Sequence, residues 1–175
     1  VLITGATGSG KTTLLSALLA EVPSEQRILT IEDVAELQVA HPHVVGLEAR
    51  QPNLEGRGGV DLAQLLRQAL RMRPDRIVLG ECRGAELREL LAALNTGHAG
   101  SAGTMHVNRL EDVPARLLAL GAVAGLNAEA LGMQAAAAFD LLIHSARGRD
   151  GRRRVDQVAR LRWARGELHV ERGFQ

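Results

Sequence analysis

The stretch GATGSGKTT, residues 5–13, holds the first side chains of this chain whose types and spacing could do chemistry. Its glycines let successive backbone N–H groups turn toward one anion, and an amine and two hydroxyls follow them. The spacing matches the phosphate-binding loop pattern GxxxxGK[ST] in full, between an apolar stretch and a leucine-rich one. We therefore expect the phosphates of a nucleotide to be bound by Gly5, Ala6, Thr7, Gly8, Ser9, Gly10, Lys11, Thr12 and Thr13.

Lys11 is the one lysine of the chain, which contains twenty arginines. An ammonium group on a thin stem fits among phosphate oxygens, whereas the planar guanidinium of arginine is bulkier. We expect Lys11 to act as a catalytic cation at the β and γ phosphates, and the Thr12 hydroxyl to ligate Mg²⁺. The expected ligands are therefore ATP and Mg²⁺.

Two apolar stretches that have the composition of strands end in residues with carboxylate side chains. Glu81 ends RIVLGE, and Glu32 and Asp33 end RILTIED. If the two strands are parallel, their carboxyl ends meet at one edge of the sheet. We expect one carboxylate there to orient an attacking water, and Glu81 and Asp33 to support the magnesium ion together with Thr12.

Two histidines, His98 and His106, bracket the stretch SAGTMHV. Their spacing across a glycine-rich turn matches no zinc-site pattern, and Cys82 is the one thiol of the chain. From the residues alone, two interpretations stay open. The pair could be ordinary structural histidines, or it could belong to the same site as the carboxylates.

The elements that must position these residues alternate along the chain. Short aliphatic or β-branched runs are followed by stretches with helical periodicity, which predicts an α/β fold with a mostly parallel sheet flanked by helices. A C-terminal β-hairpin, RVDQVARLRW with ELHVE, should turn through Ala164, Arg165 and Gly166. The expected strands are 1–4, 27–32, 44–49, 76–81, 101–107 and 140–146, and the expected helices are 11–21, 61–72, 86–95, 111–122 and 127–138.

Length and composition limit the remaining possibilities. The 175 residues, 46% of them apolar, predict one globular domain over residues 1–175. A single cysteine allows no intrachain disulfide, and the longest apolar run, residues 117–126, is too short to cross a bilayer. A cytoplasmic location is therefore the default expectation. Because the chain starts directly at its first core strand, we expect a separate N-terminal domain to precede it.

Charge is unevenly distributed along the chain. Residues 147–172 hold nine arginines and four acids, which leaves net −4 on the remainder of a chain of net charge +1. This basic end is either a docking face or a solvated pair of strands. Aromatic residues make up 2% of the chain, so the stacking platforms typical of single-stranded nucleic-acid binders are missing, and we expect no direct nucleic-acid contact.

Four motifs in a fixed order resemble the secretion ATPases of type II and type IV machines and of type IV pili. They are the P-loop GATGSGKT, the Asp box TIEDVAELQ, the Walker B segment RMRPDRIVLGECRGAE and the His box NTGHAGSAGTMHVN. The resemblance covers residues 1 to 145. Within the family, the phrases HPHVVGLEARQPNLEGRGG and ALRMRPDRIVLGE look most like the branch that powers tight-adherence (Tad or Flp) pili.

The resemblance implies a RecA-like P-loop NTPase core and assigns roles to individual residues. Glu32 corresponds to the catalytic acid that prepares the water, with Asp33 as its neighbour. Glu81 corresponds to the Walker B carboxylate. His98 and His106 correspond to His-box residues that sense or contact the γ-phosphate region.

The same resemblance implies partners. The family forms homo-hexamers at the inner face of the cytoplasmic membrane, where association with the membrane is peripheral, through an inner-membrane platform protein of a secretion or pilus machine. Arginines contributed across subunit contacts or from the N-terminal domain complete the site, and Arg50, Arg57 and Arg83 are the candidates in this chain. The implied function is an ATP-hydrolysing motor for pilin assembly or protein export.

Several alternatives stay open. Within the family, a type IV secretion or conjugation motor is the nearest one. A RecA-like nucleic-acid motor would share the P-loop and the parallel sheet but should carry aromatic or basic strand-binding loops. A small nucleoside kinase would leave the TIED and TGH segments unexplained. A non-hydrolysing assembly component would bind ATP without needing Glu32 and Glu81.

Overall fold

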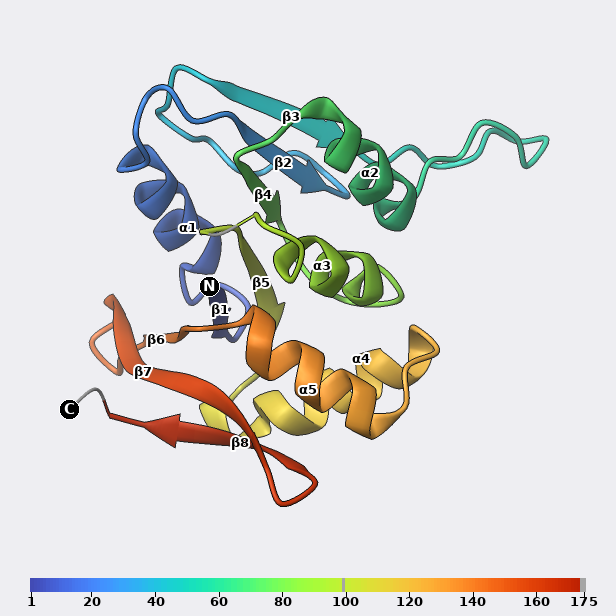
Figure 1. The fold of residues 1–175 in the computed structure, drawn as a ribbon. Helices are drawn as coiled ribbons and strands as arrows, with labels where there is room; N and C mark the ends of the chain where they lie inside the picture. Colours follow the sequence, from blue (N-terminus) through green and yellow to red (C-terminus); the bar gives the residue numbers. More distant parts are fainter. Residues whose placement is uncertain (99, 174–175) are drawn as a thin grey trace.

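The computed structural model describes residues 1–98 and 100–173, so Ala99 of the His-box segment, Phe174 and Gln175 lie outside the described residues. Within the described ranges, the strands form one eight-stranded sheet (Figure 1). They are β1 (Leu2–Gly5), β2 (Ile28–Glu32), β3 (Val44–Glu48), β4 (Arg76–Leu79), β5 (Ala102–His106), β6 (Leu142–Arg147), β7 (Arg153–Ala164) and β8 (Glu167–Arg172).

The strand order is β3-β2-β4-β5-β1-β6-β7-β8. Every pairing from β3 to β6 is parallel, and the pairings of β6 with β7 and of β7 with β8 are antiparallel. The expected α/β fold with a mostly parallel sheet is therefore confirmed. Parallel strands also bring the segments that follow β1, β2, β4 and β5 to one edge of the sheet.

The helices cover the two faces unequally. Because successive strand residues point to opposite faces, Leu2 packs in the core on the side of α2 to α5, whereas Ile3 packs on the side of α1 (Figure 1). No helix in the described ranges is long and apolar enough to span a bilayer. The helices are α1 (Lys11–Ala20), α2 (Leu62–Ala69), α3 (Leu87–Leu94), α4 (Val113–Val123) and α5 (Ala128–Ala138), with short 3-10 turns at Leu70–Met72 and Leu110–Asp112.

One expected helix is shorter in the structure than the sequence suggests. The helix expected over residues 61–72 ends as an α-helix at Ala69 and continues as a single 3-10 turn. Arg73 then adopts a left-handed conformation with φ of +54°. Pro74 accounts for the end of the helix, since the ring of proline disfavours right-handed helical geometry in the residue before it.

The expected C-terminal hairpin is confirmed and extends the sheet beyond its parallel part. Its turn is formed by Arg165 and Gly166, whose φ values are +55° and +78°. Two successive positive φ angles are the geometry of a type I′ turn, which matches the twist of the two strands. The hairpin packs its buried residues, among them Leu161 and Leu168, into the core on the α5 side of the sheet.

An extended loop, residues 50–60, here called the arm, projects from the body between β3 and α2 (Figure 1). Arg50 and Val60 form an antiparallel bridge at its base. Leu54 at its far end is fully exposed.

Candidate functional site

The loop between β1 and α1 has the backbone that an anion cradle requires. Gly8 and Gly10 have φ values of +74° and +95°, which residues with a side chain rarely adopt. Gly10 directly precedes α1. The N–H groups of the first helical turn therefore face the loop, and the positive end of the helix dipole adds to them.

Lys11 reaches back over this loop. Its Nζ donates hydrogen bonds to the carbonyl oxygens of Gly5 and Ala6, both at 3.0 Å. Burial lowers the pKa of Lys11 from its ordinary value, and the negative charges of Glu81 and Glu36 partly oppose that effect. The ammonium group therefore lies at the mouth of the loop with carboxylates facing it.

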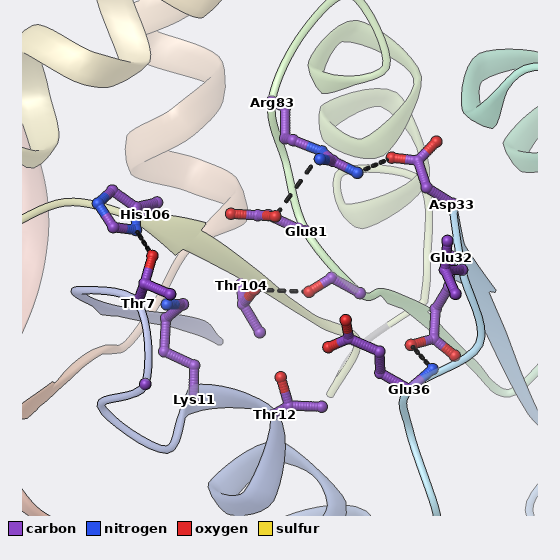
Figure 2. A pocket seen from close by; sticks show the side chains of 13 residues that line it. Thr7, Lys11, Thr12, Glu32, Asp33, Glu36, Glu81, Arg83, Thr104 and His106 are labelled. Carbon is purple, nitrogen blue, oxygen red and sulfur yellow. Dashed lines mark hydrogen bonds and ion pairs between the residues drawn. The ribbon is translucent and has the colours of Figure 1, made fainter.

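A cavity of about 350 Å³ opens in front of the loop, a size suited to a small ligand. Loop side chains line one side of it, and side chains from the ends of β2, β4 and β5 line the other (Figure 2). The lining residues are Thr7, Gly8, Lys11, Thr12, Glu32, Asp33, Val34, Glu36, Gly80, Glu81, Arg83, Thr104 and His106. The parallel sheet thus brings together residues that are up to 99 positions apart, such as Thr7 and His106.

Glu32 is held in one orientation at this cavity. The residue is 7% exposed, and its Oε1 accepts hydrogen bonds from the backbone amides of Glu36 at 3.1 Å and Leu37 at 3.0 Å. Gly80 on the neighbouring strand end leaves the necessary space, because a Cβ there would lie 2.7 Å from Cγ of Glu32. An oriented carboxylate of this kind can act as a general base toward a water molecule.

Arg83 bridges the other two expected acids. Its guanidinium forms an ion pair with Asp33 and lies 3.7 Å from Oε2 of Glu81 (Figure 2). The loop that carries Arg83 is fixed by the buried Glu86, whose Oε1 accepts from the amides of Arg83 at 2.5 Å and Gly84 at 2.7 Å. Of the three arginines expected to act on a neighbouring subunit, this one is engaged within its own chain.

The other two arginine candidates belong to the arm. Nε of Arg50 donates to the carbonyl oxygen of Gly58 at 2.6 Å, which closes the base of the arm. Arg57 lies near its tip, 3.6 Å from Glu55, with its side chain 82% exposed. Neither lines the cavity that holds Lys11.

The two histidines are separated by the structure. His106 ends β5 beside the loop, and its Nδ1 lies 3.3 Å from the hydroxyl of Thr7. His98 precedes β5, and its Nδ1 lies 3.1 Å from the carbonyl oxygen of Ala93 in α3. Since β5 runs between them toward the cavity, His98 does not line the cavity of its own chain.

The remaining loop residues divide between two sides. Thr12 lines the cavity in front of the acids, whereas Thr13 is exposed on another side of α1. Ser9 is buried, with its hydroxyl 2.8 Å from that of Ser145 in β6. It therefore anchors the loop to the sheet.

Two polar side chains of the cavity were missed by the sequence interpretation. Glu36 faces Lys11, and Thr104 donates a hydrogen bond to the carbonyl oxygen of Gly80 at 2.5 Å. A signal existed for each. Glu36 lies in the segment TIEDVAELQ together with Glu32 and Asp33, and Thr104 precedes His106 by two residues and therefore shares its face of the strand.

A metal ion at this site would need further ligands in addition to protein side chains. Among residues 1–98 and 100–173, no group of three or more His, Cys, Asp or Glu side chains is arranged to hold a metal ion. A hydroxyl at Thr12 and a carboxylate at Glu81, both on the cavity, suit a magnesium ion that takes its other ligands from phosphate and water. Asp33, the third expected metal residue, is ion-paired with Arg83.

Comparison with protein families gives a match over most of the chain. A family model described as "Type II/IV secretion system protein" matches residues 1–164. A putative conjugal transfer protein of Mycobacterium tuberculosis (strain ATCC 25618 / H37Rv) is 56% identical over 179 residues, which cover 99% of this chain and 51% of that protein. The chain thus spans about half the length of this relative.

Solved structures show the same fold. The VirB11 ATPase of the Brucella suis type IV secretion system, in complex with sulphate, is 35% identical with a TM-score of 0.74, covering 90% of this chain and 46% of that one. The pilus retraction motor PilT with bound ADP is 28% identical with a TM-score of 0.69, covering 98% of this chain and 47% of that one. These matches confirm the fold and the P-loop ATPase class expected from the sequence.

The comparisons change one expectation about the branch of the family. The relatives described above carry conjugal-transfer and type IV secretion names, together with one pilus retraction motor, rather than tight-adherence pilus names. They therefore favour the alternative interpretation, a type IV secretion or conjugation protein, over the Tad or Flp branch. Short phrases such as HPHVVGLEARQPNLEGRGG did not separate these branches.

Proposed function

Because this chain belongs to the type II/IV secretion system protein family, we propose that it is the ATP-hydrolysing motor domain of a type IV secretion or conjugation machine. One observation carries the proposal. The amine of Lys11, at the mouth of an anion cradle, and the oriented carboxylate of Glu32 line a single cavity. This arrangement joins phosphate binding to water activation.

In the proposed reaction, the loop amides and Lys11 hold the β and γ phosphates of ATP. Glu32 accepts a proton from a water molecule on the cavity side, and the water oxygen attacks the γ-phosphorus in line with the bond to the β-phosphate oxygen. That bond breaks, and ADP and inorganic phosphate leave. Oε1 of Glu32 is held by two amides, so we assign the proton to Oε2.

Magnesium fits the same cavity. We propose that Thr12 and Glu81 hold the ion together with phosphate oxygens, and that Asp33 contributes indirectly through Arg83. When bound, the ion neutralises charge on the phosphates. His106, with its ring nitrogen beside the Thr7 hydroxyl, is placed to report on the occupant of the loop.

Assembly remains part of the proposal. We propose a homo-hexamer at the cytoplasmic face of the inner membrane that contacts an inner-membrane platform protein and so associates with the membrane peripherally. Conversion of hydrolysis into subunit movement would then drive export. About half of the length of the Mycobacterium tuberculosis relative lies outside the matched region, and we propose that a corresponding region makes such contacts here.

No direct contact with nucleic acid is proposed, and the position of the aromatic side chains supports this. Phe139 is fully buried. Trp163 packs against the core, so closely that a Cβ at Gly132 would lie 2.1 Å from its ring. In the described part of the chain, neither aromatic ring is free for a base to stack upon.

A pilus motor is a second candidate, favoured by one observation. The match to the retraction motor PilT covers 98% of this chain, more than the match to VirB11 does. Assembly of pilin by a tight-adherence machine belongs to this candidate. Deletion of the gene followed by assays of DNA transfer and of surface pili would separate the two, because each candidate predicts loss of only one.

The decisive test of the motor proposal compares the full-length protein with its Glu32→Gln variant. We expect the variant to bind ATP as tightly as the wild type, because the loop is untouched, while steady-state MgATP hydrolysis falls at least about 100-fold. Wild-type protein that binds ATP in its assembled form without turning it over would contradict hydrolysis. The chain would then be a nucleotide-gated assembly component.

A further inference from the structure

Strand β6 contacts the phosphate-binding loop from behind. It pairs in parallel with β1, the strand that leads into the loop, so that Thr4 lies beside His144. None of the β6 residues, all of which the structure describes, lines the cavity that holds Lys11. Contacts from β6 can therefore act on phosphates in that cavity only through the loop.

Ser145 of β6 makes the first of these contacts. Its hydroxyl oxygen lies 2.8 Å from that of Ser9 in the loop and donates a hydrogen bond to the carbonyl oxygen of Thr4 at 3.3 Å. Because a hydroxyl has one proton to donate, Ser9 is the donor in the pair of serines. The packing is close, since a Cβ at Gly5 would lie 2.9 Å from the hydroxyl oxygen of Ser145. The start of the loop and its middle are thus both held against β6.

His144 makes a second set of contacts, on the opposite face of the strand from its neighbour Ser145. Its Nδ1 lies 2.9 Å from the hydroxyl of Thr4, and the ring also hydrogen-bonds to the backbone of Asn108. Asn108 follows His106, the residue beside the loop, by two positions. His144 therefore joins the strand before the loop to the segment after His106.

The four polar side chains of this network are buried. Their exposed fractions are 0% for Thr4, 2% for Ser9, 4% for His144 and 3% for Ser145. A buried polar group that has no hydrogen-bond partner is unfavourable, so the stable arrangement is the one in which all four are paired. The network therefore favours a single conformation of the loop.

A β-bulge lies beside the network, on the far side of β6. Ser145 pairs with Val155 and His144 pairs with Gln157, so Asp156 is the extra residue of β7. Bulges are common next to functional sites, where they change the direction of a strand. Because the extra residue belongs to β7, β6 keeps its regular pairing with β1. The irregularity of the hairpin thus leaves intact the strand that supports the loop.

We propose that Ser145 and His144 are positioning residues for phosphate binding, which hold the loop amides in the arrangement that the phosphates require. This role rests on the proposed function, because it takes the phosphates of the nucleotide to lie in the loop. Amides that are already arranged bind the substrate and the transition state alike. Loss of the network should therefore raise KM and leave kcat nearly unchanged.

The test uses two probes on the full-length protein, ATP and inorganic tripolyphosphate, which has the same phosphate chain without a nucleoside. Ser145→Ala removes the hydroxyl that contacts Ser9, and Thr4→Val removes the hydroxyl that contacts His144 while keeping the shape of the side chain. We expect each variant to bind both probes about fivefold more weakly. The KM for ATP should rise by a similar factor, with kcat within about twofold of the wild type.

The matched controls change buried hydroxyl residues elsewhere in the sheet. Ser101→Ala removes a hydroxyl that accepts from the amide of Ile77 at 2.8 Å, and Thr30→Val alters a buried threonine of β2. Neither residue lines the cavity. We expect both controls to keep the wild-type affinity for the two probes, including where urea unfolding shows a lower stability.

Two further measurements separate positioning from a general loss of stability. The double variant Ser9→Ala with Ser145→Ala should bind the probes no more weakly than the weaker single variant, because the two hydroxyls act as one pair. Losses that add would contradict this. Amide hydrogen exchange of residues 5–11 should be faster in Ser145→Ala and unchanged in Ser101→Ala, and equal exchange in the two variants would contradict a clamp on the loop.

The failure of this role differs from the failure of the proposed function. Wild-type affinity in both Ser145→Ala and Thr4→Val would overturn the positioning role. A loss confined to ATP would also overturn it, since that result would mean a contact with the nucleoside. Retention of both probes by Lys11→Ala would instead remove the phosphate site, and with it the proposed function.

Discussion

At the scale of single residues, the orientation of Glu32 depends on a neighbour that has no side chain. Gly80 lies beside Glu32 at the end of β4, and a Cβ there would come within 2.7 Å of Cγ and 3.2 Å of Oε1 of that glutamate. Gly80 does not have a positive φ, so alanine suits its backbone. The absence of a side chain at position 80 therefore leaves the space that the side chain of Glu32 occupies.

We predict that Gly80→Ala lowers the kcat of ATP hydrolysis about tenfold or more with little change in KM, because the displaced carboxylate no longer aligns the water. Steady-state kinetics measure this split. Gly103→Ala on β5 is the matched control, since its Cβ would meet its nearest neighbours at an ordinary 3.5 Å. In a protein that already carries Glu32→Gln, adding Gly80→Ala should not lower kcat any further. An additional loss of kcat in this double variant would mean that Gly80 does not act through Glu32.

His144 offers a residue-scale prediction about pH. The side chain is buried in β6, with its Nδ1 2.9 Å from the hydroxyl of Thr4 in β1. Burial lowers the pKa of His144, and the charge of Asp156 and a backbone hydrogen bond to Asn108 partly oppose this, while Lys11 adds to it. The unfolded chain takes up a proton near the ordinary pKa, about 6.5, before the folded chain does.

The stabilising effect of a neutral His144 is therefore complete above about pH 6.5 and is lost as the pH falls toward the lowered pKa of the folded state. We predict that His144→Asn reduces the dependence of the free energy of unfolding on pH in this range, independently of its effect on that free energy at neutral pH. Urea unfolding at about pH 7.5 and about pH 5.5 measures the difference. His169→Asn, at an exposed position, should keep the wild-type slope, and an unchanged slope in His144→Asn would contradict the assignment.

At the scale of elements, α2 and the arm that precedes it are joined by a capping box. The Asp61 side chain accepts from the amide of Gln64 at 2.7 Å, and the Gln64 side chain accepts from the amide of Asp61 at 3.0 Å. The box satisfies N–H groups that the first helical turn leaves without helical partners. It also fixes the point at which the arm returns to the body.

Loss of this cap should lower the measured free energy of unfolding. We predict that Asp61→Ala lowers the free energy of unfolding by about 1 kcal/mol, the usual value for an N-cap carboxylate. Glu55→Ala serves as the control, because its one ion pair, with Arg57, is exposed on the arm and such pairs contribute little. Equal unfolding free energies for Asp61→Ala and wild type would show that the box is not holding the helix end.

At the scale of the whole molecule, the arm projects from the body (Figure 1), and Arg57 on it does not line the cavity of its own chain. A guanidinium in that position can serve a nucleotide only across a contact between copies, as a ring of identical subunits would allow. The proposed hexamer and the proposed role of Arg57 therefore depend on each other. Arg83, engaged with Asp33 in its own chain, does not need a neighbour.

Mixed assemblies test this directly. We predict that Arg57→Ala and Lys11→Ala proteins, each without ATP turnover alone, recover turnover when co-assembled, because some contacts then pair an intact loop with an intact arginine. A mixture of Arg50→Ala and Lys11→Ala proteins is the comparison, because the side chain of Arg50, also on the arm, hydrogen-bonds within its own chain. Failure of the Arg57 mixture to recover, with co-assembly verified by mass, would remove Arg57 as a residue acting in trans.

The sequence by itself determined the features that are local. GATGSGKTT specified the cradle because φ angles and helix starts depend on adjacent residues, and apolar periodicity predicted the strand order along the chain and the parallel sheet. From parallel strands it also followed that Glu32, Asp33 and Glu81 would meet at one edge, and the structure places all three on one cavity. Their catalytic and metal roles stay predictions.

Only the tertiary structure decided which side chains meet across strands. The spatial order β3-β2-β4-β5-β1-β6-β7 cannot be read from chain order, and it places Gly80 against Glu32, Arg83 against Asp33, and Arg153 against the loop. His98 lies outside the cavity because it precedes β5, at the end of the sheet opposite the cavity, whereas His106 ends that strand at the cavity. Such contacts join residues 48 to 143 positions apart, and their geometry is set by packing rather than by local spacing.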